Sequence, residues 1–389
     1  MKRRKDPYMR ETRGTNIEVK KNNRNHIFRY LCAQTQTVSN PEIASALSMS
    51  LPTVTANTRE FIEQGLVRET GELASTGGRR AKALRVAAEA GLALGLDITK
   101  NHIGLALADL TGSCLAYERI HFPFAHTEDY YHRAGQELEA FFDRCQSRQT
   151  ELSRSRILGL GISFPGIVNL TMQEITYSHV LGLHAIPFAE VTRHFPYPCQ
   201  LLNDANAGAY AAGMHAKMPE RFFYLSLSNT VGGAVFHHGT LVQGSSFRCG
   251  EAGHMTIHPG GRKCYCGKLG CLDAYCAAGI LSDAAGGSLE QFFEYLDAGD
   301  VKMTALWEAY TSDLAMAVNN IHMILDCDVM LGGYVGSRIG AHIEQVREKA
   351  AGRNTFSEDG GYIRACSGGN RTAAMGAALG IIEAFLEKI

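Results

Sequence analysis

The chain has 389 residues, which is more than one ordinary core needs and enough for two or three domains. Hydrophobic residues make up 45% and charged residues 20%, and no stretch offers the ~20 uninterrupted apolar residues that span a bilayer. The basic start at residues 1–5 is followed by polar residues instead of an apolar core, which argues against a secretory signal there. We therefore expect a cytoplasmic protein with no membrane partner.

The net charge of −1 hides an uneven distribution along the chain. Residues 1–85 hold 16 Lys and Arg against 8 Asp and Glu, a net charge of +8. The rest of the chain holds 22 Lys and Arg against 31 Asp and Glu, a net charge of −9. A basic segment on an acidic body indicates a polyanionic partner at one end only.

Apolar spacing predicts three helices in the first 65 residues. The first covers 24–32, and its apolar side chains are Ile27, Phe28, Tyr30 and Leu31. A short second helix starts at Asn40, the expected N-cap, with Pro41 in its first turn. A third helix follows the turn 48–50 and ends at Gly65. Its expected core-facing residues are Val54, Thr58, Phe61 and Ile62.

This order of helices resembles a helix-turn-helix, in which the helix after the turn enters the DNA major groove. The residues expected to contact DNA are Ser50, Thr53, Thr55, Asn57 and Arg59. Two strands, 66–69 and 83–86, are joined by a glycine-rich tip that carries Arg79 and Arg80, which suit phosphates or the minor groove. We expect residues 1–86 to form a winged helix-turn-helix domain that binds operator DNA. A small helical protein-interaction module with a basic hairpin is the alternative.

From residue 92 onward, strands alternate with helices, which predicts an α/β body. The expected elements are two strands joined by a tight turn, then a helix and a buried strand: 95–98, 103–112, 130–145 and 157–163. A second set of this kind begins at 222–227. We expect two similar lobes, residues 92–206 and 207–389, with a cleft between them.

Four residues of the second lobe form a His-x9-Cys-x-Cys-x4-Cys cluster: His254, Cys264, Cys266 and Cys271. Three thiolates with one imidazole are the ligands of a closed tetrahedral zinc site, which organises structure and leaves no open position for catalysis. Reduced cysteines packed in a core are the alternative. Cys249 and Cys276 lie nearby, and either could replace one ligand.

Five motifs together resemble the ROK family, which unites transcriptional repressors with sugar kinases. In chain order they are Gly161-Ile162-Ser163-Phe164-Pro165-Gly166, Asn203-Asp204-Ala205-Asn206, Glu251-Ala252-Gly253-His254, Cys264 to Asp273, and Leu331-Gly332-Gly333. The resemblance covers nearly the whole chain. It implies a two-lobed actin-like ATPase fold of the sugar-kinase type, with ribonuclease-H-like lobes, preceded by the winged helix-turn-helix. It also assigns a metal to the four cluster residues.

Paired hydroxyls of a sugar are well recognised by carboxylates and amides. The resemblance implies five sugar-binding residues: Asn203, Asp204, Glu251, His254 and Asp273. Where the family usually has Glu, this chain has Asp273, one methylene shorter, which bears on the identity of the sugar. In kinases of the family, the aspartate that matches Asp204 is the general base that accepts the proton of the sugar hydroxyl.

The phosphate-binding loops depart from the kinase pattern. The first has lost both glycines and reads Asp97-Ile98-Thr99-Lys100-Asn101-His102. The second keeps only two glycines and reads Ser228-Asn229-Thr230-Val231-Gly232-Gly233-Ala234. Side chains there crowd the phosphates or forbid the backbone angles that a phosphate cradle needs.

The sequence thus predicts a sugar-responsive transcriptional regulator, a repressor of carbohydrate-utilisation genes, with structural zinc and without ATP. Paired operator half-sites imply a homodimer or a dimer of dimers. The alternatives are an ATP-dependent sugar kinase that uses Asp204 as its base, and a zinc-stabilised protein that binds neither DNA nor sugar.

Overall fold

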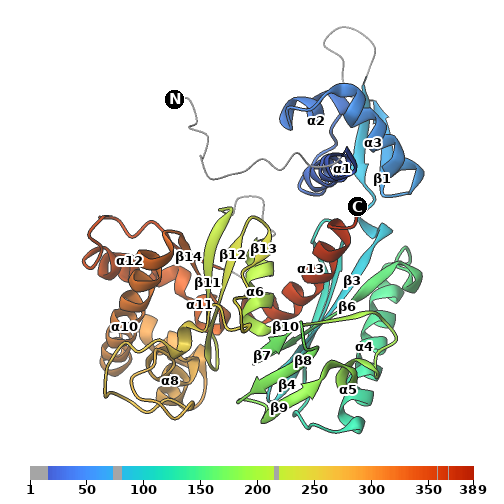
Figure 1. Cartoon of the computed structure of the whole chain (residues 1–389). Coiled ribbons are helices and arrows are strands. Elements are labelled where there is room, and N and C mark those ends of the chain that lie inside the picture. The colour runs from blue at the N-terminus through green and yellow to red at the C-terminus, as the bar shows by residue number, and fades with distance from the viewer. Residues whose placement is uncertain (1–15, 73–80, 214–218, 357, 367) are drawn as a thin grey trace. The chain divides into compact units, whose positions relative to one another are not determined.

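The computed structural model describes residues 16–72, 81–213, 219–356, 358–366 and 368–389. The chain divides into two compact units (Figure 1). The head comprises residues 1–91, 109–112 and 382–389, and the body comprises 92–108 and 113–381. The head therefore includes segments beyond residues 1–86. Within the described ranges, no helix has both the length and the apolar content to cross a membrane.

The head contains three helices followed by a two-stranded antiparallel hairpin, in the predicted order. The elements are α1 (Asn16–Cys32), α2 (Asn40–Ala46), α3 (Leu51–Glu63), β1 (Val67–Glu72) and β2 (Lys82–Val86). Its core contains Ile27, Phe28, Ile43, Val54 and Phe61, all fully buried. Two predictions need correction: α1 begins at Asn16 and not near Arg24, and Ile62 is only half-buried.

The start of α2 also differs from the prediction. Ser39, not Asn40, is the N-cap: its Oγ accepts a hydrogen bond from Glu42 N at 3.4 Å, and Glu42 Oε2 accepts one from Ser39 N at 2.6 Å. This reciprocal pair is a capping box. Asn40 instead accepts a hydrogen bond from Thr58 Oγ1 at 2.9 Å, which ties α2 to α3.

The last turn of α13 (Thr372–Leu386) belongs to the head and contacts α1. The guanidinium of Arg29 donates to both carboxylate oxygens of Glu383, with a 2.7 Å bond from Nη1 to Oε2. Arg29 Nε donates to Asn25 Oδ1 at 2.6 Å. The Glu383 side chain is 7% exposed and that of Arg29 is 33% exposed, so this bidentate pair is largely shielded from water.

Replacing Arg29 by Met is expected to destabilise the head by about 3 kcal/mol, because the carboxylate of Glu383 loses its partner while staying buried. Hydrogen exchange of the α1 amides measures this change. The double variant Arg29→Met/Glu383→Met should recover most of the loss. Arg59→Met, which breaks an exposed pair with Glu63, is the control and should change little. Equal exchange in the two single variants would contradict the prediction.

The body contains two five-stranded sheets with the same strand order, as expected for two similar lobes (Figure 1). In the first, the order is β10 (Cys199–Asn203), β6 (Ile157–Phe164), β3 (Leu92–Ile98), β4 (His102–Asp109) and β5 (Cys114–His121). In the second, the corresponding order is β15 (Ile363–Ala365), β14 (Asp328–Gly332), β11 (Arg221–Leu227), β12 (Val231–His237) and β13 (Thr240–Leu241). In each sheet the first three strands run parallel to one another. The last two strands are antiparallel to each other.

Helices and a small sheet complete the first lobe. These elements are α4 (Glu128–Arg148), β7 (Ile167–Asn169), β8 (Glu174–Ser178), β9 (Leu183–Pro187), α5 (Phe188–Thr192) and α6 (Asp204–Gly213). Gly95 and Gly161 let α13 lie directly on β3 and β6, since an added Cβ at either would be 1.9 Å from a carbonyl oxygen of α13. Glycine is therefore required at both positions.

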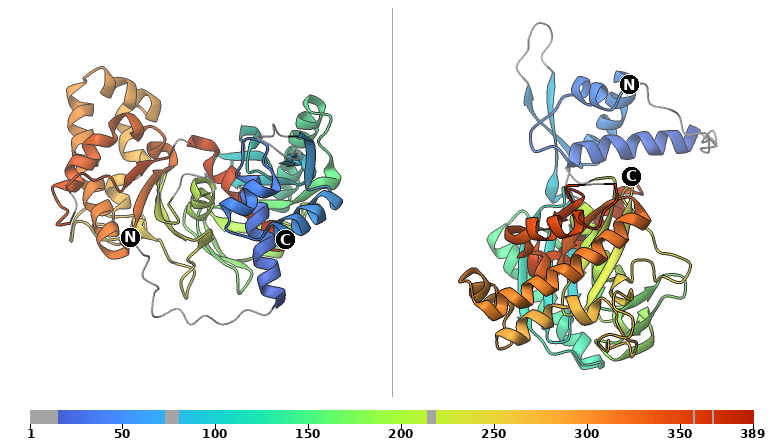
Figure 2. Two further views of the ribbon diagram at one scale, coloured as in Figure 1. Left: turned by 90° about the horizontal axis from the view of Figure 1, so that it is seen from above. Right: turned by 90° about the vertical axis from the view of Figure 1, so that its left-hand side faces the viewer.

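The second sheet is covered on both faces, as the alternation of side chains along β11 shows. Phe222 and Tyr224 pack with α6, while Phe223 and Leu225 pack in a larger core with α10 (Val301–Leu325). The remaining helices of this lobe are α7 (Asp273–Cys276), α8 (Ala278–Ser282), α9 (Leu289–Asp297), α11 (Gly333–Gly336) and α12 (Ile343–Ala351). Figure 2 shows α10 extending along this lobe.

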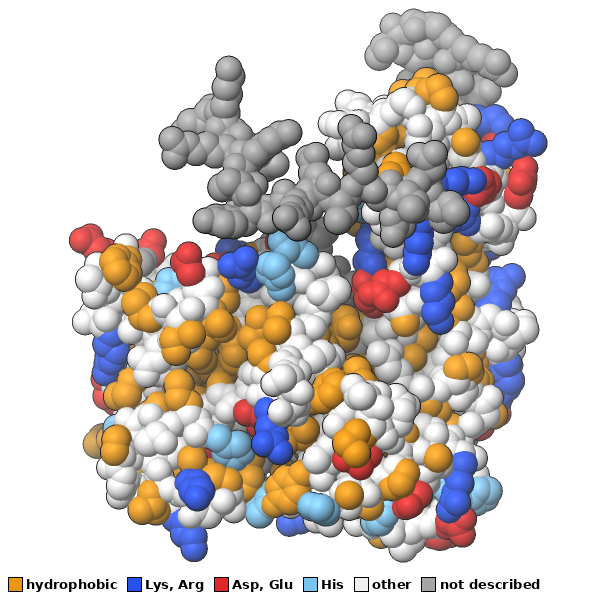
Figure 3. Space-filling model, viewed as in Figure 1, with side chains coloured by type: hydrophobic (Ala, Val, Ile, Leu, Met, Phe, Trp, Pro, Cys, Tyr) orange, Lys and Arg blue, Asp and Glu red, His pale blue; other side chains and the backbone are white. Residues whose placement is uncertain are grey.

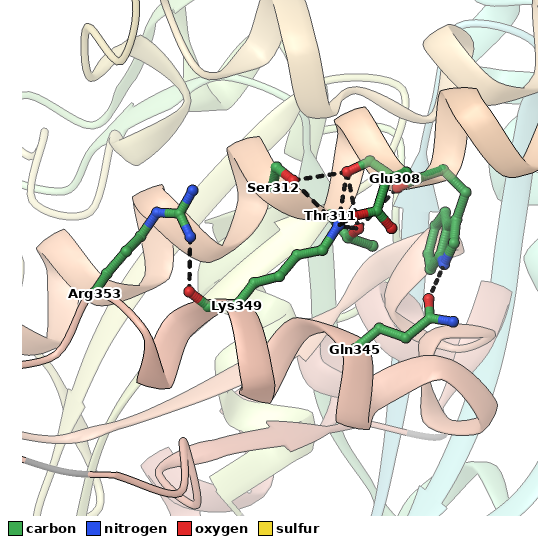
Figure 4. A network of polar contacts seen from close by, with 7 residues as sticks. Glu308, Thr311, Ser312, Gln345, Lys349 and Arg353 are labelled. Atoms are coloured by element: carbon green, nitrogen blue, oxygen red, sulfur yellow. Dashed lines mark hydrogen bonds and ion pairs between the residues drawn. The ribbon is translucent and has the colours of Figure 1, made fainter.

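A polar network fastens α12 to α10 (Figure 4). Lys349 of α12 donates to Thr311 Oγ1 at 2.7 Å and to the carbonyl oxygen of Glu308 at 2.8 Å. Its ammonium also pairs with the Glu308 carboxylate at 2.7 Å. Because Thr311 is fully buried, the bond from Lys349 satisfies a hydroxyl oxygen that is shielded from water.

Candidate ligand site and metal centre

The structure brings together the four residues that the spacing predicted as a zinc site. One ligand atom from each of His254, Cys264, Cys266 and Cys271 lies within 4.8 Å of the others. Cys266 Sγ and Cys271 Sγ are 3.8 Å apart, and Cys264 Sγ lies 3.9 Å from His254 Nδ1. Zn–S bonds of about 2.3 Å in a tetrahedron place the ligands about 3.8 Å apart. The donor set and its spacing therefore fit a structural zinc ion.

The backbone around the cluster folds back on itself. Cys264 N donates to the carbonyl of Lys268 at 2.8 Å, and Gly270 N donates to that of Arg262 at 2.8 Å. Gly270 has φ +80° and an added Cβ would lie 1.8 Å from the carbonyl oxygen of His258, so only glycine fits this turn. The loop is thus shaped to present three thiols to one point.

A cavity lies beside the metal cluster, and we call it the Glu251 cavity. It is lined by Pro165, Gly166, Ile167, Tyr177, His179, Val180, Asn203, Asp204, Thr230, Val231, Gly232, Glu251, His254, Tyr265 and Cys266. Four of the five residues proposed to bind sugar are among them. Its volume is about 170 Å³.

The junction of β10 and α6 positions Asn203 and Asp204. Asn203 Oδ1 accepts from Ala205 N at 2.8 Å and from Asn206 N at 3.1 Å, and its Nδ2 donates to the carbonyl of Gly166 at 2.8 Å. One N–H of the amide is left for a ligand. Asp204 is the first residue of α6 and its Oδ1 accepts from Ala205 N at 2.9 Å, which aims the carboxylate at the cavity from a fixed position.

Three carboxyl groups in and next to the Glu251 cavity have raised pKa values. Burial, with the nearby charge of Asp97, raises the pKa of Asp204 to about 7. Burial likewise raises the pKa of Asp97 to about 6 and shifts the pKa of Glu251 upward. Because perturbed carboxyl groups gather where ligands bind, this cluster is typical of a functional site.

Asp273, the fifth proposed sugar residue, is placed differently. It is buried, and its Oδ1 accepts a hydrogen bond from Val231 N at 2.6 Å. It is absent from the residues that line the Glu251 cavity. In this structure its carboxylate joins the segment after the metal cluster to the start of β12.

A second cavity adjoins the first at Asp204, and we call it the Asp97 cavity. It contains Asp97, Lys100, Ser228 and Asn229, the residues of the two altered phosphate loops. Its volume is about 60 Å³. Thr99 N already donates to the carbonyl of His102 at 3.0 Å, and Ser228 N donates to that of Thr230 at 3.3 Å. These two backbone N–H groups already donate hydrogen bonds within their own turns.

Sequence reasoning missed three residues with aromatic rings in the Glu251 cavity: Tyr177, His179 and Tyr265. The rings of His179 and Tyr265 stack with centroids 4.7 Å apart. The position of Tyr265 between two cluster cysteines was a signal that it lies near the metal. Nothing in the sequence pointed to His179 as its partner.

Of the five proposed DNA contacts that lie in the described residues, three are exposed at the surface of the head. Ser50, Thr55 and Arg59 are exposed and Thr53 is half-buried. Asn57 requires a correction: it is 4% exposed, and its Nδ2 donates to the carbonyl of Thr53 at 2.8 Å. Arg79 and Arg80 lie outside the described residues. Figure 3 shows Lys and Arg side chains on the described surface of the head.

The comparisons with known proteins agree with these features. The ROK family matches residues 93–383. The chain is 28% identical over 243 residues to the xylose repressor of Bacillus subtilis (strain 168), which is 61% of this chain and 61% of that protein.

Solved structures show the same fold. One described as a ROK family transcriptional regulator, a homolog of the E. coli MLC protein, covers 95% of this chain with a TM-score of 0.74 at 19% identity, and 97% of that structure is covered. A ROK hexokinase from Thermus thermophilus covers 74% of this chain with a TM-score of 0.59 at 25% identity, and 97% of the hexokinase is covered. The body thus has the predicted two-lobed, actin-like fold of sugar kinases. The chain belongs to the ROK family.

Proposed function

We propose that this protein is a sugar-responsive transcriptional repressor of carbohydrate-utilisation genes. The observation that carries the proposal is the Glu251 cavity, which gathers Asn203, Asp204, Glu251 and His254 in a body joined to a helix-turn-helix type of head. The similarity to a xylose repressor supports the same conclusion. On this proposal the protein acts in the cytoplasm as a homodimer or a dimer of dimers, whose heads read paired half-sites.

The head binds operator DNA through α3 and the tip of its hairpin. Six of the eight Lys and Arg side chains described in residues 16–86 form ion pairs. Arg59 is 80% exposed within its pair, and such pairs are weak enough for a phosphate to replace the carboxylate. Ser50, Thr53 and Thr55 stand near the start of α3, where a recognition helix meets base edges.

His254, Cys264, Cys266 and Cys271 would hold a zinc ion, which would anchor the loop that carries His254 beside the sugar. A sugar that binds one arrangement of the body more tightly than another shifts the population of arrangements, and through it the DNA affinity of the heads.

Retention of the protein's own promoter DNA at physiological salt tests this function. Arg59→Gln should weaken binding to any sequence and lower the salt slope by about 1, because one phosphate contact is lost. Arg193→Gln breaks a similarly exposed ion pair with Glu128 in the body. This control should leave the DNA affinity and the salt slope unchanged. A purified wild-type protein without sequence-selective retention would rule out the repressor.

A sugar kinase is the second candidate, because a buried carboxylate with a pKa near 7 suits a general base. ATP binding is disfavoured because the Asp97 cavity is narrow and two of its backbone N–H groups already donate hydrogen bonds within their own turns. Measuring ADP release from ATP with a panel of hexoses decides between the sugar kinase and the repressor without kinase activity. Turnover that Asp204→Asn abolishes would establish the kinase, and we expect none in the wild type.

A further inference from the structure

The three thiols of the metal cluster differ in their access to solvent. We call residues 254–271, which carry the cluster, the metal loop. Cys264 and Cys271 are buried, whereas Cys266 is exposed. The stretch from Tyr265 to Leu269 is exposed throughout, so this tip of the metal loop faces water. A small dissolved molecule can therefore reach one thiol of the cluster.

A second thiol lies close to the exposed one. Cys266 Sγ is 3.8 Å from Cys271 Sγ, and a disulfide bond measures about 2.05 Å, so the two sulfurs need to approach by about 1.8 Å. The backbone beside Cys266 has room to move, because an added Cβ at Gly267 would meet nothing within 4 Å. Cys264 is buried, and its Sγ lies 3.9 Å from His254 Nδ1. Cys266 and Cys271 are therefore the pair placed to form a disulfide.

Positive side chains flank the exposed thiol. Arg262, Lys263 and Lys268 are all exposed and lie within four residues of Cys266 in the sequence. Residues 255–272 contain no Asp or Glu. Reactive cysteines occur in partly exposed, electropositive surroundings, which favour attack by the sulfur on an oxidant. Cys266 has surroundings of this kind.

We propose that Cys266 is an oxidation-sensitive site, at which a hydroperoxide joins Cys266 to Cys271 in a disulfide and opens the metal cluster. The Cys266 thiolate attacks one peroxide oxygen and the O–O bond breaks, which leaves a sulfenic acid and a hydroxide or alkoxide that takes a proton from water. The Cys271 thiolate then attacks this sulfur: the S–S bond forms, the S–O bond breaks and hydroxide leaves. The two thiolates lose two electrons in total, and the peroxide gains them.

The disulfide changes the metal loop because it removes two of the four ligands. Zinc binds the thiolate form of cysteine, and His254 and Cys264 alone do not complete a tetrahedral site. On the proposed function, the loop that carries His254 then loses its anchor, so the oxidised protein should bind sugar at least tenfold more weakly. This effect on sugar rests on the proposed function, whereas the oxidation does not. In a reducing compartment such a disulfide is transient, as in redox sensors.

Hydrogen peroxide, added in small excess to the full-length, zinc-loaded protein, tests the site. The readouts are zinc released to a coloured chelator and the disulfide found by mass spectrometry of an unreduced tryptic digest. Trypsin cuts after Lys263 and Lys268, so the expected bond joins peptide 264–268 to peptide 269–302, and fragmentation identifies the two cysteines. We expect release of all bound zinc. Dithiothreitol with added zinc should restore the thiols and the metal.

One variant keeps a metal ligand and removes the oxidation site. Cys266→His places an imidazole where the thiolate stood, and imidazole binds zinc but forms no disulfide. This variant should release zinc to peroxide at least tenfold more slowly than the wild type. Cys249→Ser lacks a partly buried thiol outside the cluster, and Cys114→Ser lacks an exposed thiol on β5. Both controls should release zinc at the wild-type rate.

Three results would overturn the oxidation site: zinc retained with Cys266 and Cys271 reduced, a disulfide between other cysteines, or release from Cys266→His at the wild-type rate. A wild-type protein that cannot be loaded with zinc would overturn it as well. If Cys266→His holds no zinc, the pairing in the wild type decides.

Sugar affinity, measured by calorimetry before and after oxidation, separates the site from the proposed function. A wild type that binds no sugar rejects the proposed function, while the disulfide and the zinc release still establish the oxidation site. Equal sugar affinity of the reduced and oxidised proteins keeps the oxidation site and rejects its effect on the sugar cavity.

Discussion

Replacing Cys266 by Ser is expected to abolish zinc binding at the proposed site and to weaken sugar binding at least tenfold. Structural zinc contributes about 10–16 kcal/mol in small zinc domains at neutral pH, so the metal outweighs the few backbone bonds that close the loop. Without it, Glu251 and His254 lose their fixed positions, and one lost hydrogen bond of about 1.4 kcal/mol already weakens binding tenfold. Atomic emission for metal content and calorimetry for sugar binding measure both effects.

Cys249→Ser is the matched control for the zinc prediction. Cys249 is a partly buried thiol close in sequence to the cluster but outside it, so this variant should keep the full zinc content and wild-type sugar affinity. Cys276 is buried and packs with Tyr310, which makes it a poor substitute ligand. If Cys266→Ser kept a full equivalent of zinc, the assigned ligand set would be wrong.

The metal cluster was predictable because its ligands are close in sequence, and a short glycine-rich loop can bring them to one point in few ways. The fold class was predictable because strand and helix periodicities repeat in the two lobes. The stacking of Tyr265 on His179 was not predictable, because it depends on how the first lobe meets the metal loop, which no local pattern encodes.

One error at a single residue has a clear physical cause. Asn57 was placed on the DNA-facing side because it is short and polar, but it follows Val54 by three residues and therefore shares its buried face. The role of Asp273 in sugar binding stays a prediction, and its Oδ1 accepts a hydrogen bond from Val231 N at 2.6 Å. Residue type alone cannot reveal such a backbone partner.

Asp204→Asn is expected to stabilise the body at pH 8 and to have little effect on stability near pH 4. In the folded protein Asp204 keeps its proton up to about pH 7, whereas in the unfolded chain an aspartate ionises near pH 3.9. Between these values unfolding releases a proton, so the stability that Asp204 contributes at low pH is lost as pH rises through 7. Three pKa units correspond to at most about 4 kcal/mol.

Thermal unfolding of the body as a function of pH measures this effect. The melting temperature of Asp204→Asn should rise above that of the wild type progressively from pH 5 to pH 8. Asp129→Asn, a neutralisation at an exposed residue of α4, should follow the wild type throughout. Parallel curves for Asp204→Asn and the wild type would show that burial of this carboxylate carries no cost.

Sugar affinity should depend on pH with the opposite sign. A sugar hydroxyl donates most strongly to the ionised carboxylate, so wild-type affinity should fall about tenfold for each pH unit below 7 and level off above it. Asp204→Asn should bind more weakly at pH 8 and lose this dependence. The same carboxylate would then destabilise the empty body and stabilise the complex, because a ligand that supplies its missing hydrogen bonds removes the cost of its burial. Wild-type affinity that does not change between pH 5 and pH 8 would show that sugar binds without Asp204 ionising.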